Sequence, residues 1–174
     1  MNNKNGFTLI EVIIVITILS LIISALAGLF ESSMVFWNRV NNQTELQHNL
    51  RFALNKIISD IRSSKRISSS SNANEIVLFM SDTETIKYGL KNDNMSSEHP
   101  YHIIGKVLYR EVNGGNQDPI ANFIQKLSFA YNDADPAKAT FVTVTIEGAL
   151  LNNKIIVFKS GAEVKWQSFG SLIE

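Results

Sequence analysis

The feature that most limits how this chain can fold is an unbroken apolar run near its start. Residues 12–30, VIIVITILSLIISALAGLF, carry no charged side chain. As an α-helix this run is about 28 Å long, close to the ~30 Å hydrocarbon core of a bilayer. A helix buried in a soluble core usually carries a polar stripe, whereas this run has only Thr17, Ser20 and Ser24 as polar residues. The run therefore predicts a helix inserted in a membrane.

A cleaved signal peptide is the alternative to a retained anchor. Signal peptides have an apolar run of about 7–15 residues before a small-x-small cleavage site. The run here is longer, although residues 24–27 (SALA) resemble such a site. Lys4 precedes the helix, whereas Glu31 and Arg39 follow it. This bias favours a single-pass protein of the cell membrane, in contact with lipid, with a cytoplasmic N-terminus and an exported C-terminal domain.

Composition excludes several classes of function. The 174 residues suffice for one ordinary domain. The 16 basic residues are balanced by 16 acidic ones, so bulk electrostatics do not favour nucleic acid as a partner. Lys65 and Arg66, beside Arg62, form a small basic group that we interpret as a solvated helix end. The absence of cysteine excludes disulfides, thiolate metal sites and a cysteine nucleophile.

An acidic residue, Glu11, lies at the leading edge of the apolar run. An ionised carboxylate at bilayer depth costs free energy unless it is paired, so a residue of this kind is a functional hypothesis by default. The alternative is that Glu11 simply lies among the lipid headgroups.

Residues 4–11, KNGFTLIE, with the apolar run directly after them, resemble the processing site of type IV pilins and pseudopilins. In that family a membrane peptidase cuts after the glycine and methylates the new N-terminal residue. The resemblance implies a leader at residues 1–6, cleavage between Gly6 and Phe7, methylation of Phe7, and an assembly role for Glu11. It also implies a non-catalytic subunit without a cofactor. Its partners would be the prepilin peptidase/methylase, other pilin or pseudopilin subunits and the inner-membrane assembly platform.

The family reading gives Glu11 a physical role. Cleavage leaves a cationic amine on Phe7, and Glu11 lies four residues further along the helix, about 6 Å of rise. That separation is too long for a tight pair within one helix, but it suits a neighbouring subunit shifted along the axis. A pair between subunits neutralises two charges that are costly in lipid. It also favours one axial offset, or stagger, between neighbouring helices, and subunits that repeat this offset form a helical fibre.

Beyond the anchor helix at 7–30, the pattern predicts an amphipathic continuation over 31–67. Apolar residues recur at i, i+3 and i+4 spacing from Leu46 to Ile61, and neither proline nor glycine interrupts residues 29–67. The run of serine and asparagine at 68–74 predicts a loop.

From residue 75 to residue 174 the pattern changes to that of an exported β-sheet region. Strands are predicted at 75–80, 84–90, 103–112, 126–131, 140–147 and 154–159. Residues 113–115 and 152–153 are predicted turns, and residues 118–125 an irregular or helical stretch. The predicted fold class is α+β, a long N-terminal helix packed on a small antiparallel sheet. A pilin-like protein is expected to have the same architecture.

Residues 45–67 and 106–115 resemble, more loosely, the minor pilins and minor pseudopilins. This branch includes the J-type component of type II secretion and relatives from competence systems. We therefore predict a minor subunit of a type IV pilus-like fibre or of a type II secretion or competence pseudopilus. A major pilin is one alternative. A membrane-anchored binding protein with a coincidental motif is another.

The sequence predicts neither catalytic residues nor a metal site. His99 and His102 flank a proline in a predicted loop, where surface residues are commoner than metal ligands. Asp133 and Asp135 resemble the start of a calcium loop, but the glycine and the distal glutamate that such loops require are missing.

Overall fold

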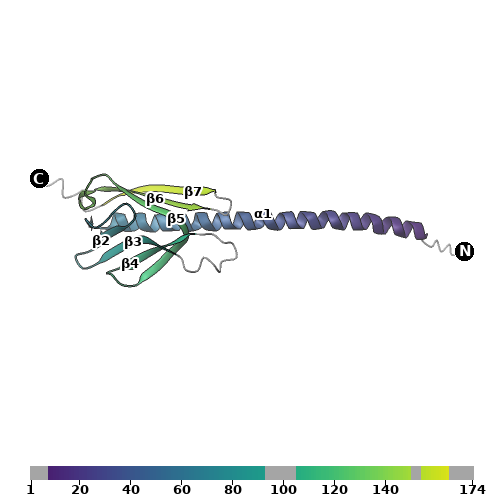
Figure 1. Ribbon diagram of the computed structural model, residues 1–174, viewed down its shortest axis with the longest axis horizontal. Helices are drawn as coiled ribbons and strands as arrows, with labels where there is room; N and C mark the ends of the chain where they lie inside the picture. The colour runs from purple at the N-terminus through teal and green to yellow at the C-terminus, as the bar shows by residue number, and fades with distance from the viewer. Residues whose placement is uncertain (1–7, 93–104, 150–153, 165–174) are drawn as a thin grey trace. The chain divides into compact units, whose positions relative to one another are not determined.

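The structure, a computed structural model, describes residues 8–92, 105–149 and 154–164. The main elements are one helix, α1, and seven strands (Figure 1). Their bounds are α1 (Leu9–Ser63), β1 (Arg66–Ile67), β2 (Ile76–Phe79), β3 (Thr85–Asn92), β4 (Lys106–Val112), β5 (Gln117–Tyr131), β6 (Phe141–Ala149) and β7 (Ile155–Glu163), with a short 3-10 helix, η1 (Pro136–Lys138), before β6. The chain divides into two compact units, Met1–Asn42 and Gln43–Glu174.

The second unit contains an antiparallel sheet whose strands follow one another in chain order from β1 to β7. Each strand pairs in the antiparallel sense with the next along the chain. The predicted turn after β4 is confirmed, with Asn113 at φ 52° and Gly114 at φ 69°. Asparagine and glycine adopt this left-handed conformation more readily than other residues.

The core of the second unit lies between the C-terminal part of α1 and one face of the sheet. The i, i+3, i+4 pattern of α1 puts its buried side chains on one stripe: Leu46, Leu50, Ala53, Leu54, Ile57, Ile58 and Ile61. The sheet contributes alternate residues, among them Ile76, Leu78, Ile86, Leu108, Val142, Val144 and Ile146. This arrangement confirms the predicted α+β class.

The helix ends at Ser63, before the predicted end at residue 67. The buried Ser64 hydroxyl donates to the Ile61 carbonyl at 2.7 Å, which satisfies one of the free carbonyls at the helix end. The backbone N–H of Lys65 then donates to Phe79 at 2.8 Å. The chain therefore enters the sheet at once, and Arg66–Ile67 pair with β2 as β1, a strand that the sequence did not predict.

The prediction of an irregular or helical stretch at 118–125 is wrong, because these residues belong to β5. The first part of β5 pairs with β4, and β6 joins it only from Ile124 onward. Pro119 lies in the part that has β4 alone as its partner, where a missing N–H is tolerated. The register shifts between the two parts, and Phe123 has a φ of 64°. Gly105 permits this bend, since a Cβ there would lie 2.5 Å from the Phe123 Cα.

Candidate functional site

Glu11 lies in the first turn of α1, where Thr8 caps the helix. The Thr8 backbone N–H donates to Glu11 Oε2 at 2.8 Å, and the Thr8 hydroxyl donates to the same oxygen at 2.9 Å. In return, the Glu11 backbone N–H is 3.4 Å from Thr8 Oγ1. This reciprocal arrangement is a capping box, which satisfies free N–H groups at a helix start. The T-x-x-E spacing of residues 8–11 is its sequence signal, which the analysis of Glu11 as an isolated charge missed.

The capping box leaves part of the Glu11 carboxylate open. An ionised carboxylate accepts about four hydrogen bonds, and both bonds from Thr8 reach Oε2. Within the described part of the chain no hydrogen bond reaches Oε1. The side chain is exposed in the single chain, so a cation outside the helix has access to it. The predicted cleavage and methylation residues, Gly6 and Phe7, lie outside the described residues.

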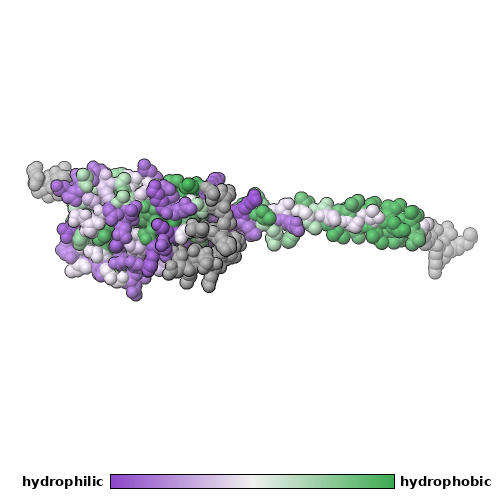
Figure 2. Space-filling model, viewed as in Figure 1, coloured by the Kyte–Doolittle hydropathy of each residue, from purple (hydrophilic) through white to green (hydrophobic). Residues whose placement is uncertain are grey.

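The first unit presents an apolar surface around the helix. The large apolar side chains from Leu9 to Phe30 are exposed, and Figure 2 shows this part of α1 as a hydrophobic surface. The polar side chains within it bond back to the helix: Thr17 donates to the Ile13 carbonyl and Ser20 to the Thr17 carbonyl, each at 2.8 Å. By length and composition, α1 is suited to cross a membrane. It is consistent with a membrane anchor.

A buried polar cluster joins α1 to the sheet in the second unit. Asp60 lies on the apolar stripe of the helix and is 7% exposed. Its carboxylate accepts a hydrogen bond from the Tyr88 hydroxyl at 2.6 Å and pairs with Arg110 and Lys56, each at 3.3 Å. Burial raises the pKa of Tyr88, and the bond to Asp60 raises it further. The sequence analysis missed this cluster, whose signal was a carboxylate between Ile57 and Ile61 on the packed face.

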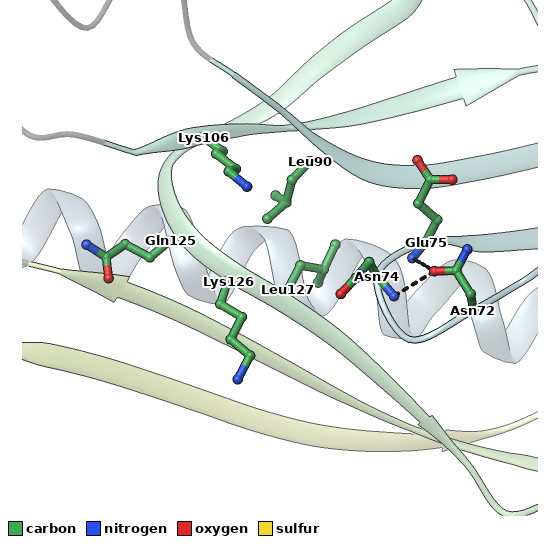
Figure 3. A pocket seen from close by; sticks show the side chains of 8 residues that line it. All are labelled: Asn72, Asn74, Glu75, Leu90, Lys106, Gln125, Lys126 and Leu127. Carbon is green, nitrogen blue, oxygen red and sulfur yellow. Dashed lines mark hydrogen bonds between the residues drawn. The ribbon is translucent and has the colours of Figure 1, made fainter.

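A polar cavity of about 400 Å³ lies beside β5. It is lined by Asn72, Asn74, Glu75, Leu90, Lys106, Gln125, Lys126 and Leu127. Figure 3 shows Lys106 and Leu90 extending into it, whereas the Lys126 side chain turns away toward Glu147, 3.7 Å from it. Glu75 is engaged by Lys87 at 2.9 Å, which lowers the pKa of the Glu75 carboxyl, and by the Tyr109 hydroxyl at 3.0 Å. Glu75 and Lys126 are therefore engaged by neighbours of their own.

The side chains considered for metal binding serve local structure where they are described. Asn132 accepts backbone N–H bonds from Thr140 and Phe141, each at 3.0 Å. Asp133 accepts from the Asp135 backbone, and Asp135 caps η1 through the Ala137 N–H. Among the described residues no group of three or more histidine, aspartate or glutamate side chains is placed to hold a metal ion. His99 and His102 lie outside the described residues.

The basic group at the end of α1 is likewise occupied by its own neighbours. Lys65 lies 3.7 Å from Asp82, and the Arg66 guanidinium lies over the Phe79 ring, 4.3 Å from its centroid. Both contacts are intramolecular and hold Lys65 and Arg66 against the sheet.

Comparison with known proteins gives one finding, at the N-terminus. The family described as "Prokaryotic N-terminal methylation motif" matches residues 1–27. No curated protein and no solved structure matches the chain. The matched segment contains the whole KNGFTLIE string, the capping box and most of the apolar run.

Proposed function

We propose that this chain, a type IV pilin-like subunit by its N-terminal methylation motif, is a minor subunit of an extruded fibre. Subunits of this family are structural and non-catalytic. The observation that carries the proposal is the motif at residues 1–27, at the head of a helix long and apolar enough to span a membrane. The fibre is a type IV pilus-like filament or a type II secretion or competence pseudopilus.

Processing comes first in this proposal. The prepilin peptidase removes the leader, residues 1–6, by cutting between Gly6 and Phe7, and then methylates the Phe7 amine. Gly6 suits the cut because a residue without Cβ lets the backbone approach an enzyme closely. The segment from residue 7 to 30 then anchors the subunit, with its N-terminus on the cytoplasmic side and the sheet exported. The assembly platform of the inner membrane receives the processed subunit.

Assembly then depends on Glu11. We infer that Thr8 holds the Glu11 carboxylate through Oε2. The open Oε1 then accepts a hydrogen bond from the Phe7 amine of a neighbouring subunit. In lipid this pair replaces two costly charges with one charge-assisted hydrogen bond. Because it forms at only one axial offset between helices, the pair sets the stagger of the fibre.

The assignment to a minor rather than a major subunit has its own support. Major pilins often carry a proline within the anchor, whereas the first proline of this chain is Pro100. Residues 45–67 also resemble the minor branch. The abundance of the protein in sheared fibres tests this point, because a major subunit is the main component of such a preparation and a minor one is a trace component.

The experiment that tests the proposal is the intact mass of the protein from its native membrane. The expected mass corresponds to loss of residues 1–6 and gain of one methyl group. A Gly6→Val variant should instead retain the leader, because the added side chain obstructs the peptidase. A Gly6→Ser variant, whose side chain is smaller, is the control and should be processed to an intermediate extent. A wild-type chain that remains uncut in cells with an active prepilin peptidase would leave only a membrane-anchored domain.

A further inference from the structure

The last strand of the sheet, β7, has an open edge. Among the described strands it has a neighbour on one side only. It pairs with β6 from Glu163 opposite Phe141 to Ile155 opposite Ala149 without a register shift. The Val164 N–H donates to the Thr140 carbonyl, and hydrogen bonding alternates along an antiparallel ladder. Alternate residues therefore direct their backbone N–H and C=O groups to the open edge: Ile155, Val157, Lys159, Gly161 and Glu163.

The side chains of these residues lie on the outer face of the sheet. Ile155 and Val157 are 56% and 54% exposed, and the Phe141 ring covers Gly161 at the other end of the strand. Edge strands are usually shortened, bulged, interrupted by proline or given charged side chains, lysine above all, which prevents pairing with other chains. Of these devices β7 has the charge alone, at Lys159, which admits a strand that carries an opposite charge. β7 is nine residues long, with neither a bulge nor a proline. Its backbone is therefore a template for an added strand.

The charge pattern of β7 disfavours a second copy of this strand as the occupant. Full antiparallel overlap of two copies places Lys159 opposite Lys159, and like charges directly opposite are destabilising. A shift of two residues removes that repulsion but sets Lys159 opposite Val157 or Gly161, without an acidic partner. Glu163 is the one acidic residue of β7, and the offset that sets it opposite Lys159 pairs only residues 159–163 and leaves the exposed Ile155 and Val157 without partners. The other edge of the sheet, β1, has two residues, too few to cover β7.

We propose that the open edge of β7 receives an extended strand from a different subunit of the same fibre. That strand carries an acidic side chain opposite Lys159 and apolar side chains opposite Ile155 and Val157. Lys159 has no ion-pair partner within the described part of the chain, so its charge is available. This inference rests on the proposed function, since the fibre supplies the partner.

The test is photo-crosslinking in the native cells with the full chain. Benzoylphenylalanine replaces Ile155, and Thr83, an exposed residue in the turn between β2 and β3, carries the same probe as a matched control. The expected adduct from position 155 maps to an extended, acidic segment of another pilin-like subunit.

A second change, Val157→Pro, should reduce the yield of this adduct by about tenfold, because proline removes a backbone N–H that donates to the added strand. Proline is tolerated on an edge strand, and Val157→Thr, which keeps the donor, should retain the adduct. Lys159→Glu should lose it and Lys159→Arg should keep it.

Several outcomes would overturn strand addition. One is an adduct within residues 165–174 of the same chain, and another is an adduct between two copies of β7. Equal yields for Val157→Pro and Val157→Thr, or equal yields from positions 155 and 83, would also contradict it. The intact mass is measured in the same samples. A processed, methylated chain without the expected adduct therefore refutes the β7 proposal alone, and an unprocessed chain counts against the fibre function itself.

Discussion

At the scale of single residues, Glu11 has a capping role in the structure and an assembly role in the proposed function, and a substitution can separate the two. Its side chain closes the capping box with Thr8 and keeps one oxygen open. Glu11→Gln preserves the box, because a glutamine oxygen also accepts the Thr8 bonds, but it removes the charge. Glu11→Val removes both roles. The capping bonds lie within one helix, whereas in the proposed function the charge acts between subunits.

We predict that Glu11→Gln and Glu11→Val are both inserted and cleaved but assemble poorly. The physical reason is that neither leaves a carboxylate for the neighbouring amine, so the preferred stagger is lost. The measurement is the amount of mature protein in sheared fibres relative to the membrane. Thr8→Val, which removes the Thr8 hydroxyl but keeps the Glu11 carboxylate, is the control. Its amount in sheared fibres should fall less than that of the Glu11 variants. Normal assembly of Glu11→Gln would contradict the electrostatic stagger.

Tyr88 provides the second prediction at this scale. Its hydroxyl is a partner of the buried Asp60 carboxylate, at 2.6 Å. Tyr88→Phe should reduce the free energy of unfolding by about 1–3 kcal/mol, since a buried acceptor loses a hydrogen bond. Thermal unfolding of the full chain in mild detergent measures the change. Tyr109→Phe is the matched control, because it removes a hydrogen bond to Glu75. It should reduce the free energy of unfolding by less, since Glu75 is more exposed than Asp60 and keeps its ion pair with Lys87.

The same residue makes a prediction about alkaline pH. The pKa of Tyr88 is raised in the fold, so the folded state holds the proton more tightly than the unfolded state. Its contribution to stability is fully present below the unfolded pKa, about 10, and is lost as the pH rises from there through the folded pKa. Above about pH 10, the stability of the Tyr88→Phe variant should therefore fall less steeply with pH. If the free energy of unfolding falls equally steeply with pH for the wild type and for Tyr88→Phe, other groups cause the loss of stability at alkaline pH.

At the scale of elements, the close packing of α1 on β6 depends on Gly148. A Cβ at this position would lie 2.8 Å from Leu46 Cδ1 and 3.1 Å from Leu50 Cδ1. We predict that Gly148→Ala reduces the free energy of unfolding by about 1–3 kcal/mol through overpacking. In a Leu46→Ala background the same change should cost less, because the smaller side chain leaves room. A double-mutant cycle measures this coupling, and additive costs would contradict the close contact.

Elements also show what the sequence predicted and what it did not. The strands with regular alternation, such as β6, were predicted because their pattern reports one buried face. The first half of β5 was missed because Pro119 and its polar neighbours are local signals for a turn, and only pairing with β4 makes them a strand. β1 was missed for a related reason: neither proline nor glycine interrupts residues 29–67, so nothing local ends the helix before residue 67, and the strand state of Ile67 comes from β2.

The candidate site shows the same division between local and tertiary information. The T-x-x-E spacing and the apolar run are local patterns, so the sequence was sufficient to place Glu11 at the head of the helix. The partners of Asp60 were not predictable, since Tyr88 and Arg110 come from strands far along the chain. The open edge of β7 depends on the order of strands in the sheet, which periodicity does not specify.

At the scale of the whole molecule, the two units have different sources of stability. The buried core begins at Leu46 and lies entirely within the second unit, whereas the apolar residues from Leu9 to Phe30 are exposed and depend on an environment outside the chain. The first unit is thus consistent with a membrane anchor. The second has the helix stripe, the sheet and the Asp60 cluster, and we expect these to support an independently folding domain.

We predict that a chain beginning at Gln43 is soluble without detergent and unfolds cooperatively. It keeps the helix residues that form the core and loses only the apolar surface that favours association. Circular dichroism during thermal unfolding, with the molecular mass from light scattering, measures both properties. A matched chain beginning at Ala53 lacks Leu46 and Leu50, which are 1% and 0% exposed, and should unfold at a lower temperature or not fold. If the longer chain aggregates or lacks a cooperative transition, the first unit contributes to the folding of the second, and the boundary at Gln43 is not a folding boundary.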